Sequence, residues 1–283
     1  MTTTVKLEKG RLRPQRNRRD HYVPQGYLRG FIDPWRLGHS QPLWHFDVTQ
    51  GVWSERSTRE VGYRIGLYDL TTVNDVLETA DSTFKAFENT FPRVRREMIA
   101  KNFENWLDHR EFLLHYMQMM RARSTLFFEQ KSVDGQSLLL YEIERVNPDG
   151  VSVVLRSMEP SRPSSNFIRN WTITEMRTEI KKGVGWLTDL DWALRVCGSP
   201  DDPFVTSESP LLLSGSGSNV AECAQHPDSL FFFPLCWQAC LIGSRRPFDF
   251  TTGVFGHEDM ATFRRMYRQS AKLFLVSPQK LNT

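Results

Sequence analysis

The sequence predicts an α+β fold with a largely antiparallel sheet, a helical middle segment and a basic, disordered N-terminal arm. Strand-like alternation of apolar and polar residues occurs around residues 42–55 and again over residues 190–243. Between these regions, from about residue 74 to residue 131, apolar residues recur every three or four positions, as in helices. Strands and helices therefore come in blocks, which favours an antiparallel sheet over a doubly wound nucleotide-binding fold.

The basic arm covers residues 1–19. Seven of the 36 lysines and arginines lie there, but only one of the 33 acidic residues, so the rest of the chain has 29 bases and 32 acids. Such an arm can neutralise phosphates and give sequence-independent affinity for nucleic acid. Alternatively, it is a solvated terminus without a partner.

Residues 20–283 are expected to form a single α+β domain, because 40% of the chain is hydrophobic and its length suffices for a core. A subdomain break is most plausible near residues 146–165, where prolines and glycines gather. No apolar run approaches the roughly 20 residues that a membrane helix needs, and no secretory signal is evident. We therefore expect a cytoplasmic protein without membrane contact, whose four cysteines are reduced and buried.

The first elements of the body are a short helix and a hairpin. Pro24 suits the first turn of a helix, and Tyr27, Leu28 and Phe31 share its inner face. Residues 42–47 and 51–55 flank a Thr-Gln-Gly turn and predict a β-hairpin. Its aromatic residues attach it to the core or form a base-stacking platform; they are Trp44, Phe46 and Trp53.

The helical middle is expected to begin at Asn74, with an interruption at Pro92, and to continue in a buried helix over Trp106–Phe128. A short strand at Val151–Leu155 and a helix over Thr172–Trp186 follow. The last third predicts strands at residues 190–196, 204–206, 211–213, 230–233 and 239–243. A closing helix over His257–Gln269 and a strand over Ala271–Val276 complete the chain.

The segment His21-Tyr22-Val23-Pro24-Gln25 is the first candidate site. A helix start offers unpaired N–H groups that can hold an anion such as phosphate. His21 could act there as a general acid or base, while Tyr22, Gln25 and Arg29 line a binding surface. The alternative is structural: the tyrosines pack in the core and His21 caps a backbone group.

This segment, followed by Tyr27-Leu28-Arg29, also resembles a family. It is similar to the N-terminal motif of DUF4238, a group of uncharacterised bacterial proteins. Further similar features are VGYRIGLY at residues 61–68, Arg121, the segment FVTSESP at residues 204–210 and the later FPL at residues 233–235. The resemblance spans about residues 20–276 and implies a fold and a site location, but no activity.

Two departures from the family pattern lie in the turn after residue 206. Glu208 replaces the aspartate of the family, and Ser209 replaces an asparagine. In one interpretation Thr206, Ser207 and Glu208 bind backbone N–H groups of a tight turn. In the other, Glu208 faces His21 and Arg121 in a catalytic site for water activation and oxyanion stabilisation.

Our leading hypothesis is a phosphodiester hydrolase, nuclease-like and associated with toxin action or defence, with His21, Glu208 and Arg121 as catalytic residues. Tyr22, Gln25, Arg29, Thr206 and Ser207 would bind the substrate, and a divalent metal is a conceivable cofactor. The alternative is a non-enzymatic module that binds nucleic acid or another ligand. In a third hypothesis, the segment around His21 is only a folding element.

Overall fold

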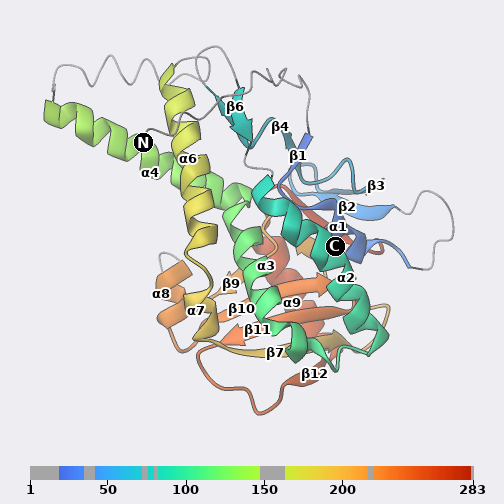
Figure 1. Cartoon of the computed structure of the whole chain (residues 1–283). Coiled ribbons are helices and arrows are strands. Elements are labelled where there is room, and N and C mark those ends of the chain that lie inside the picture. The colour runs from blue at the N-terminus through green and yellow to red at the C-terminus, as the bar shows by residue number, and fades with distance from the viewer. Residues whose placement is uncertain are drawn as a thin grey trace, which may run out of the picture.

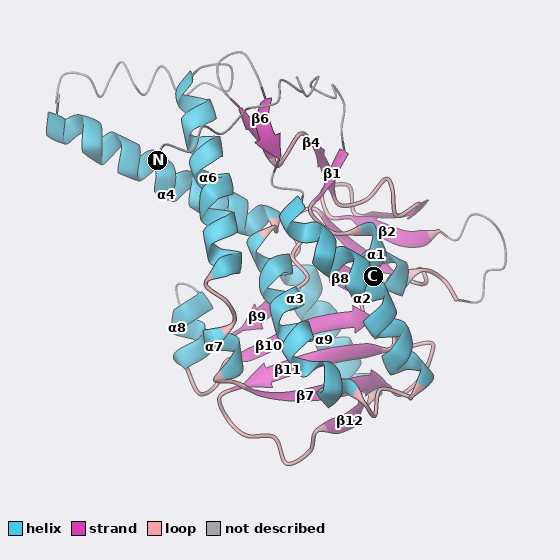
Figure 2. Cartoon of the chain, viewed as in Figure 1, coloured by secondary structure: helices cyan, strands magenta, loops and turns pink. Residues whose placement is uncertain are grey.

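The computed structural model describes residues 19–34, 42–71, 76–79, 82–146, 163–215 and 220–281. The fold is α+β, as predicted: two mainly antiparallel sheets lie among helices, and a pair of helices projects from the body (Figures 1 and 2). The larger sheet has the order β12-β7-β11-β10-β9. Its strands are β7 (Asp191–Cys197), β9 (Leu212–Ser214), β10 (Leu230–Cys236), β11 (Ala239–Ser244) and β12 (Thr252–Phe255).

Helices cover both faces of this larger sheet because its central strands are apolar on both sides. On β10, Phe231 and Phe233 belong to the main core with α2 (Ser82–Ala100) and α3 (Arg110–Ala122). Phe232, which points to the opposite face, packs in a second core with α9 (His257–Ser270). The period-2 alternation of a strand thus assigns neighbouring phenylalanines to different helices.

The smaller sheet has the order β3-β2-β13-β8 and joins the beginning of the chain to its end. The predicted hairpin is confirmed as β2 (Leu43–Asp47) and β3 (Val52–Arg56). β13 (Phe274–Ser277) lies between β2 and β8 (Thr206–Ser207) and is antiparallel to both. Leu275 of β13 and Phe46 of β2 both belong to the core beneath α9, so this sheet and α9 pack against the same hydrophobic core.

The N-terminal segment forms β1 (Arg19–His21), α1 (Gln25–Leu28) and the 3-10 turn η1 (Arg29–Phe31). β1 pairs with β4 (Tyr63–Ile65), so Arg19 belongs to a strand and not to the predicted arm. Residues 1–18 lie outside the described residues. Pro24 precedes α1 as its N-cap, and Tyr27, Leu28 and Phe31 are buried as expected.

The start of the helical middle differs from our prediction. Residues 76–79 form strand β6 (Val76–Thr79), which pairs with β5 (Asp69–Thr71), and the helix α2 begins only at Ser82. The apolar spacing of Val76 and Leu77 fits a helix as well as a strand, and pairing with β5 makes this segment a strand. The predicted interruption at Pro92 is also wrong, because Pro92 lies inside α2. A Cβ on Gly26 would be 3.0 Å from Pro92 Cγ, so this glycine lets α1 approach the proline closely.

The predicted helix over Trp106–Phe128 is divided into η2 (Trp106–His109), α3 and the start of α4 (Thr125–Val146). Ser124 separates α3 from α4, and its hydroxyl accepts a hydrogen bond from Phe127 N at 3.2 Å. The prediction that this region is buried is confirmed for α3, whose Leu113, Met117 and Met120 are fully enclosed.

The expected helix over Thr172–Trp186 is two helices, α6 (Pro163–Lys181) and α7 (Gly185–Thr188). Gly183 lies between them with φ +80°, a conformation that ends helices and favours glycine. The expected strand Val151–Leu155 and most of the possible subdomain break lie outside the described residues.

The last third follows the predicted order of strands, with two additions. The strand β12 pairs in parallel with β7 at the sheet edge, and a short helix α8 (Val220–Gln225) precedes β10. The four cysteines are free thiols, and three of them are buried. No helix within the described ranges is long and apolar enough to cross a membrane.

Candidate functional site

His21 lies on β1 beside Tyr63, with ring centroids 5.8 Å apart. Burial lowers the pKa of His21, which favours the neutral imidazole. Its Nε2 atom is buried without a hydrogen-bond partner among the described residues. The next two amides, of Tyr22 and Val23, both donate to Gly62 O, at 2.8 and 3.1 Å. The backbone of the motif is therefore fixed by the loop before β4.

Arg123 is the buried cation next to His21. Its side chain is 1% exposed, forms an ion pair with Glu88 and donates to the carbonyl of His21. Its Nε donates to the Tyr68 hydroxyl at 3.2 Å. A buried guanidinium is stable only when its charge is paired and its N–H groups are hydrogen-bonded. These contacts tie the N-terminal motif to the junction of α3 and α4.

Glu208 is 3% exposed and accepts hydrogen bonds from three consecutive backbone amides. Its Oε1 accepts from Lys272 N at 2.5 Å and from Leu273 N at 3.2 Å, and its Oε2 accepts from Phe274 N at 3.2 Å. These contacts match the interpretation in which the turn residues bind backbone N–H groups. The carboxylate joins the end of β8 to the start of β13.

Arg121 faces another part of the molecule. It forms an ion pair with Glu179 of α6, and its guanidinium lies 5.5 Å from the ring centroid of Trp186. Within the parts of the chain that the structure describes, no hydrogen bond or ion pair joins Arg121, His21 and Glu208 to one another. Glu208 and Arg121 connect parts of the fold through their side chains, whereas His21 is bound by Arg123 through its backbone carbonyl.

The expected substrate-binding residues also take different positions. Tyr22, Thr206 and Ser207 are buried, Gln25 is half-buried and Arg29 is exposed. Thr206 Oγ1 lies 3.0 Å from the hydroxyl of Tyr27, which donates to Pro234 O at 2.6 Å. Ser207 Oγ accepts from the Ser209 amide at 3.2 Å, so it stabilises the turn.

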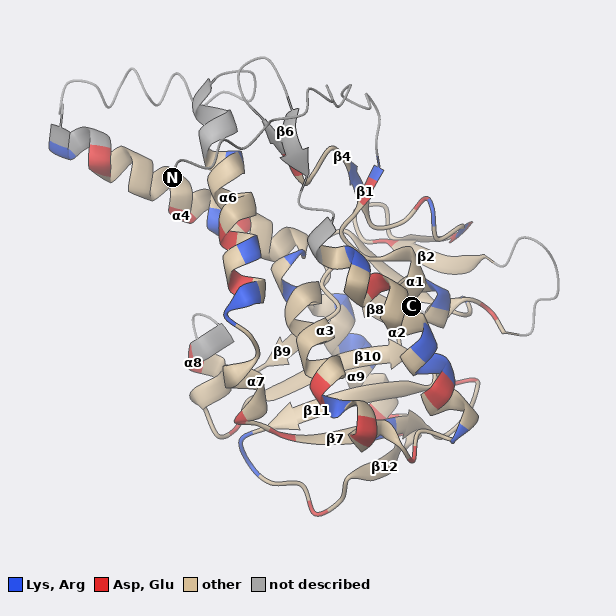
Figure 3. Cartoon of the chain, in the orientation of Figure 1, with Lys and Arg blue, Asp and Glu red and all other residues tan. Residues whose placement is uncertain are grey.

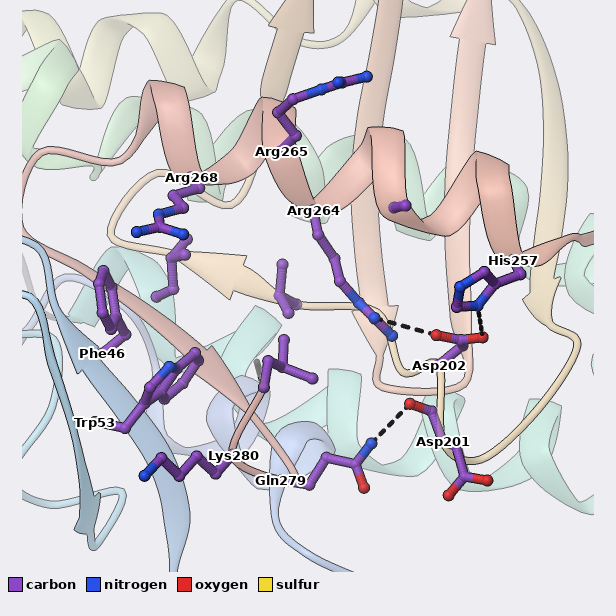
Figure 4. Close-up of a pocket in the computed structure, with 14 residues that line it drawn as sticks. Phe46, Trp53, Asp201, Asp202, His257, Arg264, Arg265, Arg268, Gln279 and Lys280 are labelled. Carbon is purple, nitrogen blue, oxygen red and sulfur yellow. Dashed lines mark hydrogen bonds and ion pairs between the residues drawn. The ribbon is translucent and has the colours of Figure 1, made fainter. Parts of the chain in front are cut away.

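A cavity of about 690 Å³ lies elsewhere, between α9, the β2–β3 hairpin, the loop around Asp202 and the C-terminal segment. Such concave sites are where ligands usually bind. Phe46 and Trp53 form its aromatic wall, and their ring centroids lie 5.2 Å apart (Figure 4). We call this cavity the α9 pocket.

Positive charge dominates the lining of the α9 pocket. Its lining includes four cationic residues, three of them on α9, and two carboxylates; the charged residues are Arg264, Arg265, Arg268, Lys280, Asp201 and Asp202. Within the described ranges, Arg265, Arg268 and Lys280 have no carboxylate partner. Figure 4 shows Arg264 and Arg268 on the pocket side of α9, whereas Arg265 extends away from it. The guanidinium of Arg268 lies 5.4 Å from the ring centroid of Phe46, at the aromatic wall.

The acidic end of the pocket is a connected group around Asp202. Its Oδ2 lies 2.7 Å from His257 Nδ1, and its Oδ1 lies 3.1 Å from Arg264 Nη1. The hydrogen bond from His257 and the charge of Arg264 lower the pKa of Asp202. Arg264 also donates twice to Pro203 O, at 3.2 Å, and Gln279 Nε2 donates to Asp201 O at 2.8 Å. The loop is thus held from two sides.

The comparison with family models agrees with the resemblance seen in the sequence. Residues 19–254 match the model of DUF4238, described as a protein of unknown function. The chain belongs to the DUF4238 family. No curated protein and no solved structure matches it. The DUF4238 match includes the hairpin wall and the Asp202 loop but ends before α9, so the cations of the pocket come from outside the matched segment.

Sequence reasoning found one wall of the pocket and missed the other. The sequence predicts Phe46 and Trp53 as a candidate stacking platform, but it predicts the arginines of α9 only as part of a closing helix. Their visible signal is the spacing of Arg264, Arg265 and Arg268 at the end of an amphipathic helix. Within the described ranges of this DUF4238 protein, no three His, Cys, Asp or Glu side chains gather as metal ligands.

Proposed function

We propose that this protein binds single-stranded nucleic acid in the α9 pocket. The observation that carries the proposal is the composition of one cavity, with an aromatic wall on β2 and β3 and a row of arginines on α9. Single-strand binding sites combine aromatic rings, on which unpaired bases stack, with cations that follow the phosphates.

The charge distribution supports a phosphate-bearing ligand. Arg268 and Lys280 lack acidic partners among the described residues, so their positive charge is available to an anion. In the ribbon view of Figure 3, basic and acidic residues lie interspersed along α2 and α6. Guanidinium groups are the preferred partners of phosphate because they donate in a planar fork.

The aromatic wall supports a ligand with a planar ring. Trp53 is half-buried, and its Nε1 has no acceptor within the described parts of the chain. The guanidinium of Arg268 lies over the ring of Phe46. A nucleotide could therefore stack its base on the aromatic wall and place its phosphate next to Arg268. This arrangement favours the binding-module alternative over the hydrolase site first assigned to His21, Glu208 and Arg121, because no hydrogen bond or ion pair joins those three side chains within the described residues.

The pocket is also long for a single nucleotide. Arg268 lies eleven residues beyond His257 on α9, which is about 16 Å along a helix axis. Stacked nucleotides rise by about 3.4 Å each, so the pocket spans several of them. We therefore favour an oligonucleotide over a mononucleotide. The basic arm, toxin action, defence and a cytoplasmic location stay predictions.

Binding can be measured by fluorescence anisotropy with the full-length protein and labelled single-stranded DNA and RNA, with duplex and mononucleotides as competitors. We expect Arg268→Gln to weaken binding and to reduce the slope of log K against log salt by about 0.7, the share of one phosphate contact. Trp53→Leu should weaken binding by about 1–3 kcal/mol, the usual value for one stacked base.

Arg96→Gln is the control, since Arg96 is an exposed arginine of α2 that does not line the pocket. Its affinity should stay much closer to that of the unmodified protein. Binding that is equally tight in the Arg268→Gln and Trp53→Leu proteins would refute the proposal. If the protein prefers a mononucleotide to the oligonucleotide, the proposed ligand is a mononucleotide and not a longer strand.

A further inference from the structure

The strongest chemical feature of the α9 pocket is the pair formed by His257 and Asp202. Their side chains lie 2.7 Å apart through Nδ1 of the imidazole and Oδ2 of the carboxylate. Asp202 is 18% exposed, whereas His257 is 82% exposed. The carboxylate is thus held in the wall while the imidazole reaches into solvent at the pocket (Figure 4).

Asp202 is well placed to orient the imidazole. Its second oxygen is fixed by Arg264, which is itself anchored to the carbonyl of Pro203. With Nδ1 bound to a carboxylate, the proton of a neutral imidazole stays on Nδ1 and Nε2 is left as the acceptor. A histidine oriented by a carboxylate in this way is the common arrangement of a general base.

We infer that the α9 pocket cleaves the strand it binds, with His257 as the general base of phosphodiester hydrolysis. This inference rests on the proposed binding function, and it places the hydrolase activity at residues other than those first expected. His257 is then the catalytic residue, Asp202 its positioning residue, and Arg264 the cation that brings positive charge to them.

The reaction balances with water as the only co-reactant. His257 Nε2 takes a proton from a water molecule, and the water oxygen forms a new bond to phosphorus. The bond between phosphorus and the leaving sugar oxygen breaks, and that oxygen takes a proton from solvent. The His257 imidazolium returns its proton to solvent. The products are a phosphomonoester and a free hydroxyl, and no oxidation or reduction occurs.

The spacing of the cations suits this reaction. Arg264 lies seven residues after His257, about 10 Å along the helix axis, but its side chain returns toward Asp202 and brings a positive charge to the pair. Preorganised cations of this kind stabilise the charge that develops on phosphate oxygens. Arg268 and the aromatic wall would hold a neighbouring nucleotide. The residues that bind the strand and the residues that cleave it would then lie at different positions along α9.

The test uses the full-length protein and labelled single-stranded DNA and RNA, with EDTA and with magnesium, and follows binding and cleavage in parallel. We expect the unmodified protein to cleave both the single-stranded DNA and the single-stranded RNA. In His257→Ala the rate should fall by about 10²–10⁴-fold, the usual contribution of a general base, while affinity is retained. Because His257 is highly exposed, added imidazole should enter the vacated space and restore part of the rate.

Two further variants sharpen the result. Asp202→Asn should lower kcat with little change in KM, because it disturbs the orientation of the base and not the contacts to the strand. His226→Gln is the histidine control: His226 accepts a hydrogen bond from Asp228 N at the end of α8 and does not line the pocket. Its rate should equal that of the unmodified protein.

The failures of the two proposals are distinguishable. Binding without cleavage in any condition would overturn the inference and leave the binding function standing, whereas absence of binding would overturn both. Cleavage that persists in His257→Ala at the same rate would overturn the assignment of the base. Cleavage of RNA alone would overturn attack by water, since only RNA has a 2′-hydroxyl that can replace it.

Discussion

Glu208 provides the clearest prediction, because its structural and catalytic interpretations differ in what its removal would do. In the structure its carboxylate accepts three backbone amides at the start of β13. We expect Glu208→Ala to lower the stability of the protein, whereas a catalytic carboxylate can usually be removed without loss of stability. The substitution therefore separates a folding element from a site residue.

The size of the effect follows from the three amides. Lys272 and Leu273 are exposed, so water can replace the lost acceptor there, but Phe274 is 4% exposed. A buried N–H without an acceptor costs about 1–3 kcal/mol, and a hydrogen bond to a charged acceptor contributes about 1.5–3 kcal/mol. We expect Glu208→Ala to lower the free energy of unfolding by about 3 kcal/mol, which lowers the Tm by about 6–12 °C.

The measurement is thermal and urea unfolding, followed by circular dichroism, with Glu104→Ala as control. Glu104 is exposed on the turn after α2, so its removal should change stability by less than about 0.5 kcal/mol. Glu208→Gln should fall between the two, because an amide oxygen replaces only one of the two carboxylate oxygens. An unchanged Tm in Glu208→Ala would refute the structural role assigned to this residue.

Two other predictions concern the buried groups near the N-terminal motif. Arg123→Met should cost about 3–5 kcal/mol in urea unfolding, since it breaks a buried ion pair with Glu88, whereas Arg93→Met on the exposed face of α2 should cost little; equal effects would contradict this role. Burial lowers the pKa of His21 and of His45, so the unfolded chain binds more protons below about pH 6.5 and stability should fall as the pH decreases from there. His21→Gln should make stability less dependent on pH in that range, and an unaltered dependence would exclude His21 as a contributor.

Much of the fold could be predicted because its strands and helices have clear periodicity. The hairpin over residues 42–55, the late strands and α9 are visible as alternation or as helical spacing. The errors occur where two structures fit one pattern. Val76 and Leu77 suit a helix as well as a strand, and only pairing with β5 decides. Pro92 lies inside α2, and Gly26 of α1 packs closely against it, a contact between residues 66 positions apart.

The site was harder to predict because it depends on long-range contacts. Spacing could not show that Glu208 meets the amides before β13, or that Arg123 rather than Arg121 lies next to His21. The α9 pocket brings residues 46 and 53 to residues 264–280, and no local signal links these segments. The chemistry of the residues was readable, but which of them share a cavity required the fold.

The most direct measurement of the central proposal is ultraviolet crosslinking of the full-length protein to labelled single-stranded nucleic acid, followed by peptide mapping. The α9 pocket as binding site predicts crosslinks to Trp53 or Phe46 on the hairpin, and their loss in Arg268→Gln, since that arginine holds the neighbouring phosphate. Crosslinks confined to residues 1–18, with none on the hairpin, would contradict the proposal and assign the affinity to the basic arm.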